Sequence, residues 1–485
     1  MSVFLLPEEP VLSLDAYLAT TSGGVGLGRA RELGPAGVIE VVGESGLRGR
    51  GGGGFPTGRK WQGIASQSDA RRYMVCNGAE GEPGTFKDRA LLRANPYQLV
   101  EGVLIAAYAI GAVESFICLK ASFEREIEAV TRAVEEFQAA ELCQDCTVTI
   151  VAGPEEYLYG EEKAMLEVIE GNEPLPRWLP PYIHGLFATD AQLGWQAHDP
   201  SGGGASGGGA SGGGASVGGA SGTGAAGVPS GGSNPTLVNN VETLSNVPHI
   251  LARGAEWYRS MGTAESPGTI VTTVVGDVVA PDVGEVEMGT PLRDVIDAVG
   301  SGLSDGRSVK AVFSGVANAV ITADHLDVPV SYEGFAAIGS GMGSAGFIVY
   351  DDTTCMVDAA YRLSRFLSVE SCGQCPPCKL GSSAITEHLE AIETGSGSAA
   401  DLDAITGWLE RVTDGNRCYL AVEEQILVSS ILAEFLDEFV EHIRSGQCTH
   451  PRSLPIPKLV DLDGGVATYD ESFWRKRPDW SYSEP

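Results

Sequence analysis

The chain has 485 residues, of which 43% are hydrophobic, and its 64 acidic residues outnumber its 32 basic ones to give a formal charge of −32. This length exceeds one ordinary core and predicts two or three domains. Because so negative a surface repels nucleic-acid phosphates and anionic lipid head groups, we expect no nucleic-acid partner.

The amino terminus shows no basic segment followed by a cleavage site, so a secretory signal is not expected. The most apolar stretch, residues 99–113, contains Glu101 and is shorter than the roughly 20 residues that cross a bilayer. It predicts a buried helix and no direct membrane span. We therefore expect a cytoplasmic chain, which reaches the inner face of the membrane only as a peripheral part of a complex, and whose cysteines stay reduced.

The first half of the chain alternates segments of helical and of strand periodicity. In one predicted helix, apolar Ile127, Val130, Val134 and Phe137 recur at spacings of three and four, with charged residues on the other face. Such alternation is typical of an α/β layer. The predicted helices cover residues 99–110, 123–137 and a segment starting near 161, and the predicted strands cover 115–120 and 147–152.

A low-complexity insertion follows, beginning with Ser-Gly-Gly-Gly-Ala repeats at Ser201 and rich in Gly, Ser, Ala and Thr up to about Ser233. Without apolar side chains to offset backbone entropy, residues 199–233 are predicted to be a disordered linker. A phosphate-binding loop is the weaker alternative, because such loops are short and framed by a strand and a helix.

The remaining chain changes pattern twice. Strand-like runs at residues 269–275 and 310–313, with a short helix at 291–299 between them, predict a small α+β domain. Beyond Cys355 the apolar residues recur with helical period almost throughout, which predicts a helical bundle. Its predicted helices cover residues 359–367, 383–392, 399–412 and 423–443.

Four cysteines have a distinctive spacing. Cys372, Cys375 and Cys378 lie two residues apart, and Cys418 follows 40 residues later. One loop can direct three thiolates at three irons while a distant fourth completes a [4Fe–4S] cube. Structural zinc is the alternative, although its ligands more often come as two pairs. The other six cysteines are expected to be small buried residues, and the seven histidines, which form no pair at metal-binding spacing, are expected to have ordinary surface or core roles.

A glycine-rich segment, residues 49–54, matches the dinucleotide pattern G-x-G-x-x-G. Its context differs from a Rossmann turn, because Pro56 disfavours helical geometry at Phe55, where the helix should begin. Glycines let the backbone approach a planar or phosphorylated ligand, and Arg50 and Lys60 would supply positive charge. The segment therefore suggests an anionic ligand, with a flexible surface turn as the alternative.

Five motifs in order, spread between about residues 34 and 445, resemble the NADH-binding flavoprotein (51 kDa, F-type) subunit of respiratory complex I. The same motifs are similar to those of the diaphorase modules of formate dehydrogenases and NAD-reducing hydrogenases. The motifs are residues 45–58 with Lys60 and Trp61, Asn77 with 82–89, Tyr157 with 160–162, 239–243, and 370–378.

The resemblance implies three folds along the chain, α/β, α+β and all-α. These are a Rossmann-like FMN- and NADH-binding α/β domain of unusual topology at residues 1–258, a ubiquitin-like β-grasp (SLBB) domain at 259–350, and a helical bundle carrying the [4Fe–4S] cluster at 351–450. An extended C-terminal tail would cover residues 451–485.

The resemblance also implies the binding residues. Acidic side chains near the nucleotide would accept ribose hydroxyls and repel a 2′-phosphate, so NADH is expected rather than NADPH. The nucleotide would contact Phe55, Glu82, Tyr157, Glu162 and Tyr182, and the cluster Cys372, Cys375, Cys378 and Cys418. The cofactor-binding set is completed, for FMN, by Gly49, Arg50, Gly51, Gly52, Gly54, Lys60, Asn77, Glu80, Gly160, Glu161, Asn239, Asn240 and Leu420.

The implied activity is that of an NADH:acceptor oxidoreductase, in which hydride passes from NADH to FMN and single electrons pass through the cluster to a partner, or the reverse to reduce NAD. No catalytic side chain is expected, because the flavin performs the chemistry. The implied partners are a thioredoxin-like [2Fe–2S] subunit and a further iron–sulfur or catalytic subunit.

Some positions depart from the family pattern. Ala79 and Gly81 stand where complex I subunits usually carry an aspartate and a serine, and Leu179 stands where some members have a lysine. These departures favour a formate dehydrogenase or hydrogenase module over ordinary complex I. They also leave open an alternative function, a cluster-bearing relay or scaffold subunit that has lost flavin or NADH binding.

Overall fold

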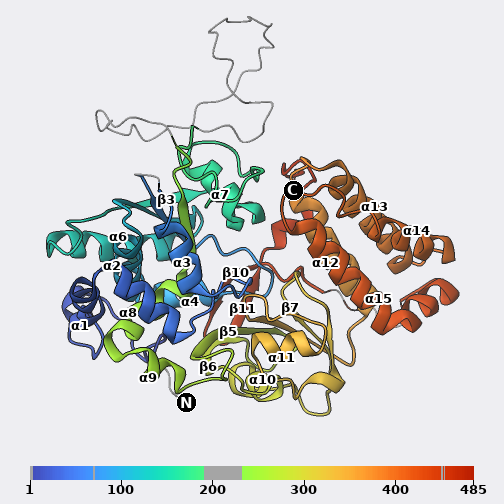
Figure 1. The fold of residues 1–485 in the computed structure, drawn as a ribbon. Coiled ribbons are helices and arrows are strands. Elements are labelled where there is room, and N and C mark those ends of the chain that lie inside the picture. Colours follow the sequence, from blue (N-terminus) through green and yellow to red (C-terminus); the bar gives the residue numbers. More distant parts are fainter. Residues whose placement is uncertain (1–3, 69–70, 190–231, 449–451, 453, 485) are drawn as a thin grey trace, which may run out of the picture.

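The computed structural model describes residues 4–68, 71–189, 232–448, 452 and 454–484. In Figure 1, an α/β region coloured blue to green and a helical region coloured orange to red stand on opposite sides, with a mixed sheet below. The chain is thus a mixed α/β protein with a parallel sheet and a helical C-terminal region. The predicted disordered insertion, residues 199–233, lies outside the described residues except for its last two.

The α/β region is built on a parallel four-stranded sheet with the order β3-β2-β1-β4. The strands β2 (Glu114–Lys120) and β3 (Thr147–Gly153) confirm the two predicted strands. The strands β1 (Tyr73–Asn77) and β4 (Thr236–Asn240) were not predicted. Because β4 follows the insertion, segments far apart in sequence pair at the centre and edge of one sheet.

Helices cover the sheet, and the central one, α5, is buried along almost its whole length, as predicted for residues 99–110. It begins where Asn95 caps its amide groups and ends at Gly111, whose φ of 73° suits glycine. No helix among the described residues is long and apolar enough to cross a membrane. The helices of this region are α1 (Leu14–Leu18), α2 (Val25–Ser45), α3 (Thr57–Ala65), α4 (Lys87–Ala94), α5 (Pro96–Ile110), α6 (Glu124–Ala139), α7 (Glu162–Ile169), α8 (Val241–Arg253) and α9 (Ala255–Arg259), with a 3₁₀ turn at Tyr157–Gly160.

A second, five-stranded sheet has the order β6-β5-β9-β7-β8, in which only β5 and β9 are parallel. Its hydrophobic face packs on α10, whose apolar residues recur with helical period as predicted. The elements are β5 (Thr269–Gly276), β6 (Asp282–Glu287), α10 (Leu292–Gly300), β7 (Val309–Ser314), β8 (Ile321–Thr322), α11 (Tyr332–Ala337) and β9 (Gly346–Asp351).

The C-terminal region packs four helices and then returns toward the rest of the chain. Its last segment forms a short hairpin and places Lys476 against Glu370, whose Oε1 lies 2.8 Å from Nζ in a fully buried ion pair. The elements are α12 (Met356–Glu370), α13 (Pro376–Glu393), α14 (Ala399–Leu409), α15 (Leu420–Ser445), β10 (Leu459–Asp463) and β11 (Val466–Tyr469).

A buried polar group lies between the helices of this region. The Oγ of Ser364 on α12 donates to Oε1 of Glu424 on α15 at 2.6 Å and lies 2.8 Å from Oγ1 of Thr386 on α13. Burial raises the pKa of Glu424 to about 8. The carboxyl group is therefore neutral at pH 7 in the folded chain, although it would be ionised in the unfolded one.

The shifted Glu424 pKa predicts a pH-dependent stability. Between pH 5 and 8 the folded chain holds a proton that the unfolded chain has lost, so stability falls as pH rises toward 8. Glu424→Gln cannot ionise, and each unit of pKa difference is worth about 1.4 kcal/mol. We expect the variant to melt several degrees higher than the unmodified chain at pH 8.5, with little difference at pH 5.

Melting curves measured every half pH unit would test this expectation. The matched control is Glu434→Gln, which changes an exposed carboxylate on the same helix. It should keep the pH profile of the unmodified chain. Parallel profiles for the Glu424→Gln variant and the unmodified chain would contradict the prediction.

Candidate functional site

A cavity of about 590 Å³ lies at the carboxyl edge of the parallel sheet. Asn77 and Asn240 end the neighbouring strands β1 and β4, pair with each other in register, and both line this cavity. Ligands of open α/β sheets bind at this edge, and the volume is in the range of small-molecule sites. The cavity is completed by residues that follow β7, precede β9 and begin α15.

The two asparagines are fixed by different contacts. Nδ2 of Asn77 donates to the carbonyl of Gly160 at 2.7 Å, and its Oδ1 accepts from the amide of Ala79. Oδ1 of Asn240 accepts from the amide of Glu242 and so caps α8. Both side chains therefore sit in one orientation at the cavity wall, because each satisfies a backbone group that would otherwise lack a partner.

The glycine-rich segment forms a separate loop beside the cavity. Arg48 and Pro56 form an isolated antiparallel bridge, and α3 begins at Thr57, directly after the proline. The loop therefore does not lead from a strand into a helix, as expected from the position of Pro56. Three of its glycines, Gly51–Gly53, line the cavity.

The last glycine of the loop has a packing role. Gly54 has φ of 58°, and a Cβ there would lie 2.5 Å from the ring of Tyr332. The hydroxyl of Tyr332 donates to the carbonyl of Gly49 at 2.6 Å. These two glycines thus let the loop rest on the helix α11 rather than line the cavity.

The expectation that Arg50 gives positive charge to a ligand does not fit its position. Its fully buried guanidinium donates to Tyr258 Oη at 3.0 Å and to the carbonyls of Pro267 and Thr269, and its Nε lies 3.9 Å from Glu242. Those contacts lie outside the cavity, because the loop turns this side chain toward the start of β5. Arg50 therefore anchors the loop to the second sheet.

A buried lysine that the sequence analysis did not select orders the cavity wall. Nζ of Lys87 lies 2.7 Å from Asp88, 3.0 Å from Glu242 and 3.1 Å from Oδ1 of Asn240. Burial alone would lower the pKa of Lys87, but the two carboxylates raise it above its ordinary value. Burial raises the pKa of Asp88, which lines the cavity, to about 6. The only sequence signal for Lys87 and Asp88 was their place in the motif at residues 82–89.

Glu80, a predicted FMN contact, holds the residues of that motif in place. Its carboxylate accepts from the amide of Asp88 at 3.0 Å and from Nε of Arg89 at 3.2 Å. Both charged side chains are almost completely buried. Because a buried charge must be paired, this ion pair fixes the start of α4 against the cavity.

The opposite wall carries a group of hydrogen-bonded acids. The hydroxyl of Tyr157 donates to Oε2 of Glu82 at 2.6 Å and lies 3.2 Å from both carboxylate oxygens of Glu423. Burial raises the pKa of Glu82 and raises that of Glu423 well above its ordinary value, since the two carboxyl groups also repel each other. Glu423 was not predicted, and it lies three residues after the predicted Leu420.

Glu161 joins the cavity to the cysteine loops. Its carboxylate accepts from the amides of Lys163 and Ala164 and so caps α7. Nζ of Lys163, in turn, donates to the carbonyl of Arg417, next to Cys418. The start of α7 is therefore tied to the segment before α15.

The predicted cofactor-binding residues divide into two groups. Eight predicted residues do not line the cavity. The side chains of Phe55 and Tyr182 are about half exposed, Oδ1 of Asn239 accepts from Trp61, and Lys60 pairs with Glu162 at 2.5 Å. The other three are Gly49, Arg50 and Gly54, described above. Those that line it are Gly51, Gly52, Asn77, Glu80, Glu82, Tyr157, Gly160, Glu161, Asn240 and Leu420.

The four spaced cysteines line a second, smaller cavity. Cys372 and Cys375 lie in the loop between α12 and α13, Cys378 lies in the first turn of α13, and Cys418 lies just before α15. Burial raises the pKa of Cys378 to about 11 and raises that of Cys418 further. These thiols would lose their protons on binding a metal cluster.

The spread of these four sulfurs discriminates between iron–sulfur and zinc. No three of them lie within 4.8 Å of one another. In a tetrahedral zinc site, with Zn–S bonds of about 2.3 Å, the sulfurs would be about 3.8 Å apart. Four thiols that each reach a different iron of a cube need wider spacing. The donor set therefore fits a [4Fe–4S] cluster.

The two cavities share a wall. Leu158, Cys418 and Leu420 line both of them. A group held in the large cavity and a cluster held by the four cysteines would therefore be immediate neighbours.

Comparisons with known proteins match both parts of the site. Residues 42–192 match the family described as the Nuo51 FMN-binding domain, and residues 358–442 match the NADH-ubiquinone oxidoreductase-F iron–sulfur binding region. The F-type subunit of the NADH-quinone oxidoreductase of Streptomyces coelicolor is 35% identical over 452 residues, covering 91% of this chain and 90% of that protein. The HndC subunit of the NADP-reducing hydrogenase of Solidesulfovibrio fructosivorans is 34% identical, covering 92% of this chain and 83% of that protein.

A solved structure shows the same arrangement. A chain of an NAD⁺-reducing [NiFe]-hydrogenase in its H₂-reduced state superposes with a TM-score of 0.71 at 28% sequence identity. The match covers 92% of this chain and 66% of the hydrogenase chain. The similarity thus includes the α/β region and the helical region together.

The wall formed by Tyr157, Glu82 and Glu423, called here the acidic wall, yields a prediction for Tyr157→Phe. Its hydroxyl donates to Glu82 and lies within hydrogen-bonding distance of Glu423, and these contacts lower the pKa values of both carboxyl groups. Since a hydrogen bond to a charged group is worth about 1.5–3 kcal/mol, its loss should raise the pH at which the pair ionises by about one unit or more. Infrared titration of the protonated carboxyl band, assigned with Glu82→Gln, would measure the shift.

Tyr159→Phe is the matched control, because that hydroxyl donates instead to the carbonyl of Val151. It should leave the titration where it is in the unmodified chain. An unchanged titration in the Tyr157→Phe variant would show that the tyrosine does not govern the two acids.

Proposed function

The chain belongs to the family of F-type subunits of NADH-quinone oxidoreductases, and we propose that it is an NADH:acceptor oxidoreductase subunit working within a larger assembly. The observation that supports this proposal best is the shared wall, since Cys418 and Leu420 line both the large cavity and the cysteine cavity. FMN bound in the large cavity would supply two-electron hydride acceptance and one-electron release, and a bound [4Fe–4S] cluster would carry single electrons onward or back.

Large-cavity residues would hold FMN rather than react with it. The glycines Gly51 and Gly52 permit close approach of its planar ring or phosphate, since they place no side chain in the space. Asn77 and Asn240 offer amide groups from fixed positions at the sheet edge. We assign no catalytic side chain, because hydride transfer needs positioning and no general base.

The acidic wall would face the nucleotide. Glu82, held by Tyr157 and by the amide of Val316 at 2.6 Å, can accept hydrogen bonds from ribose hydroxyls and would repel a 2′-phosphate. This supports NADH over NADPH. Phe55 and Tyr182, whose rings are exposed, and Glu162, paired with Lys60, complete the proposed nucleotide set.

The relay-only alternative receives less support. Ala79 and Gly81, two departures from the family pattern, line the large cavity without filling it. The methyl group of Ala79 and the bare backbone of Gly81 leave the space beside Asn77 open. We therefore keep flavin and nucleotide binding in the proposal.

The domain division is proposed as residues 1–258, 259–350, 351–450 and 451–485. The β-grasp (SLBB) identity of the second domain is supported by its strand order, in which an opening hairpin is followed by a helix and the last strand inserts parallel to the first. The insertion proposed within the first domain is residues 199–233, and it ends before β4.

The proposed partners are a thioredoxin-like [2Fe–2S] subunit and a further iron–sulfur or catalytic subunit. Similarity to both quinone-reducing and hydrogenase subunits supports assembly into a multi-subunit complex of one of these kinds. We propose a cytoplasmic location, peripheral to the inner face of the membrane through that complex, where thiols stay reduced.

The proposed function can be tested on the purified complex by measuring bound FMN, iron and NADH-dependent ferricyanide reduction. About one FMN and four irons per copy of this chain, with activity, are expected. A cluster without flavin would overturn the enzyme proposal and favour the relay alternative.

Cys418→Ala tests the cluster assignment. Because a cube needs its fourth ligand, iron held by this chain should fall from about four to three or fewer. FMN binding should change less than about tenfold, since the substitution removes only one sulfur from the cavity wall. Cys143→Ser, which changes a partly buried cysteine beyond α6, is the control. A full four-iron complement in Cys418→Ala would refute the assignment.

A further inference from the structure

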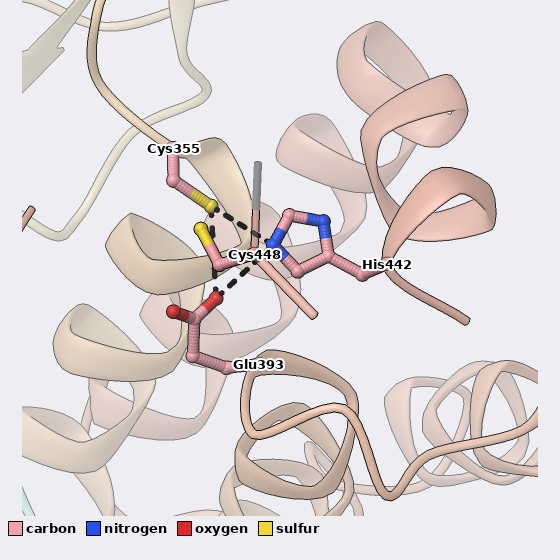
Figure 2. Close-up of side chains that lie close together, drawn as sticks. All are labelled: Cys355, Glu393, His442 and Cys448. Atoms are coloured by element: carbon pink, nitrogen blue, oxygen red, sulfur yellow. Dashed lines mark hydrogen bonds and ion pairs between the residues drawn. The ribbon is translucent and has the colours of Figure 1, made fainter. Parts of the chain in front are cut away.

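A second group of metal-binding side chains lies in the helical region, apart from the four cluster cysteines. The ligand atoms of Cys355, Glu393, His442 and Cys448 all lie within 4.8 Å of one another. Figure 2 shows the four side chains pointing toward a common centre from different elements. Cys355 caps α12, Glu393 ends α13, His442 lies in the last turn of α15, and Cys448 follows that helix.

The distances match the edges of a tetrahedron around zinc. Sγ of Cys355 lies 3.4 Å from Nε2 of His442 and 3.6 Å from Oε2 of Glu393, and Nε2 lies 3.5 Å from Oε2. Zinc bonds of about 2.3 Å to sulfur and about 2.0–2.2 Å to nitrogen and oxygen give edges of about 3.6, 3.6 and 3.4 Å. These three edges agree with the expected ones within about 0.2 Å, and Sγ of Cys448 lies within 4.8 Å of the other three ligand atoms.

The surrounding groups orient these ligands. Nδ1 of His442 lies 2.8 Å from the carbonyl of Glu438, which can only accept, so Nδ1 carries a proton and Nε2 is the ring nitrogen placed to bind a metal at the centre. Metal-binding histidines are commonly held in this way. The amide of Asp358 donates to Sγ of Cys355 at 3.4 Å, a contact that would stabilise the thiolate formed on metal binding.

The four side chains lie at the opposite ends of the helices that carry the cluster cysteines. Each of α12, α13 and α15 has cluster cysteines at one end and members of this group at the other. Since α12 has 15 residues, the two ends are separated by about 22 Å. The group therefore lies too far away to share ligands with the cluster.

We propose that Cys355, Glu393, His442 and Cys448 bind one zinc ion. Four protein ligands leave no open coordination position, so the ion is structural. It fixes the far ends of the three helices that carry the cluster cysteines, and it anchors the start of the C-terminal segment at Cys448. This site is independent of the proposed redox function.

The sequence analysis assigned these residues ordinary roles. The seven histidines showed no metal-spaced pair, and Cys355 and Cys448 were counted among the scattered cysteines. The ligands come from four separate places in the chain, and only the spacing of His442 and Cys448, six residues apart, was local. Tertiary packing brings them together.

Metal analysis and X-ray absorption on the full chain, purified anaerobically with reductant, would test the proposal. We expect about one zinc per chain in addition to the cluster iron. The zinc absorption edge should fit two sulfurs at about 2.3 Å and two nitrogen or oxygen ligands at about 2.0–2.2 Å. A fit to four sulfurs would instead indicate zinc replacing iron at the cluster cysteines, and would overturn the proposal.

Variants provide a second test. His442→Ala and Cys448→Ser should lower the zinc content at least fivefold while iron stays near four per chain. His388→Ala is the matched control, because this histidine lies in the same region but contacts Asp401 at 2.8 Å, away from the group. It should retain zinc.

Adding zinc distinguishes a chain that cannot bind zinc from one that lost its zinc during purification. If the purified chain contains no zinc, added zinc chloride should bind with a dissociation constant below about 1 μM and raise the melting temperature. Failure to bind zinc under these conditions, or unchanged zinc content in both variants, would show that the four side chains form only a hydrogen-bonded cluster.

Discussion

A shared wall between two cavities constrains the rest of the structure. Cys418 and Leu420 must border a cavity at the edge of the parallel sheet and also face the cysteine loop between α12 and α13. The helical region therefore has to be held firmly against the α/β region. Lys163 contributes by contacting the carbonyl of Arg417, and the returning C-terminal segment contributes through the buried pair of Lys476 and Glu370.

Paired buried charges do much of this positioning. Lys87 sits among two carboxylates and Asn240, and Arg89 pairs with Glu80. Removing one partner of such a pair leaves an uncompensated charge, which costs more than the pair itself contributes. These pairs therefore specify where the cavity wall lies more than they add to stability. The acidic wall around Tyr157 differs from these ion pairs, because burial raises the pKa values of its two carboxyl groups, those of Glu82 and Glu423.

The helices α12, α13 and α15 are constrained at both ends. Cluster cysteines join one end of the three, and the proposed zinc ligands join the other. The neutral Glu424 and its hydroxyl partner lie between them. Fixing both ends limits sliding of the helices along one another, which keeps Cys418 at the shared wall.

The sequence alone determined the local features: the α/β alternation, helices such as α5 and α6, the cysteine spacing, and the non-helical backbone at Phe55 before Pro56. These depend on periodicity, dihedral preference and short-range spacing. Tertiary structure decided that β4 joins β1, that Arg50 turns away from the cavity, that Glu423 enters it, and that four scattered residues converge near His442. These features depend on contacts between segments that are tens to hundreds of residues apart. Such contacts follow from how whole elements pack, so no local sequence pattern predicts them.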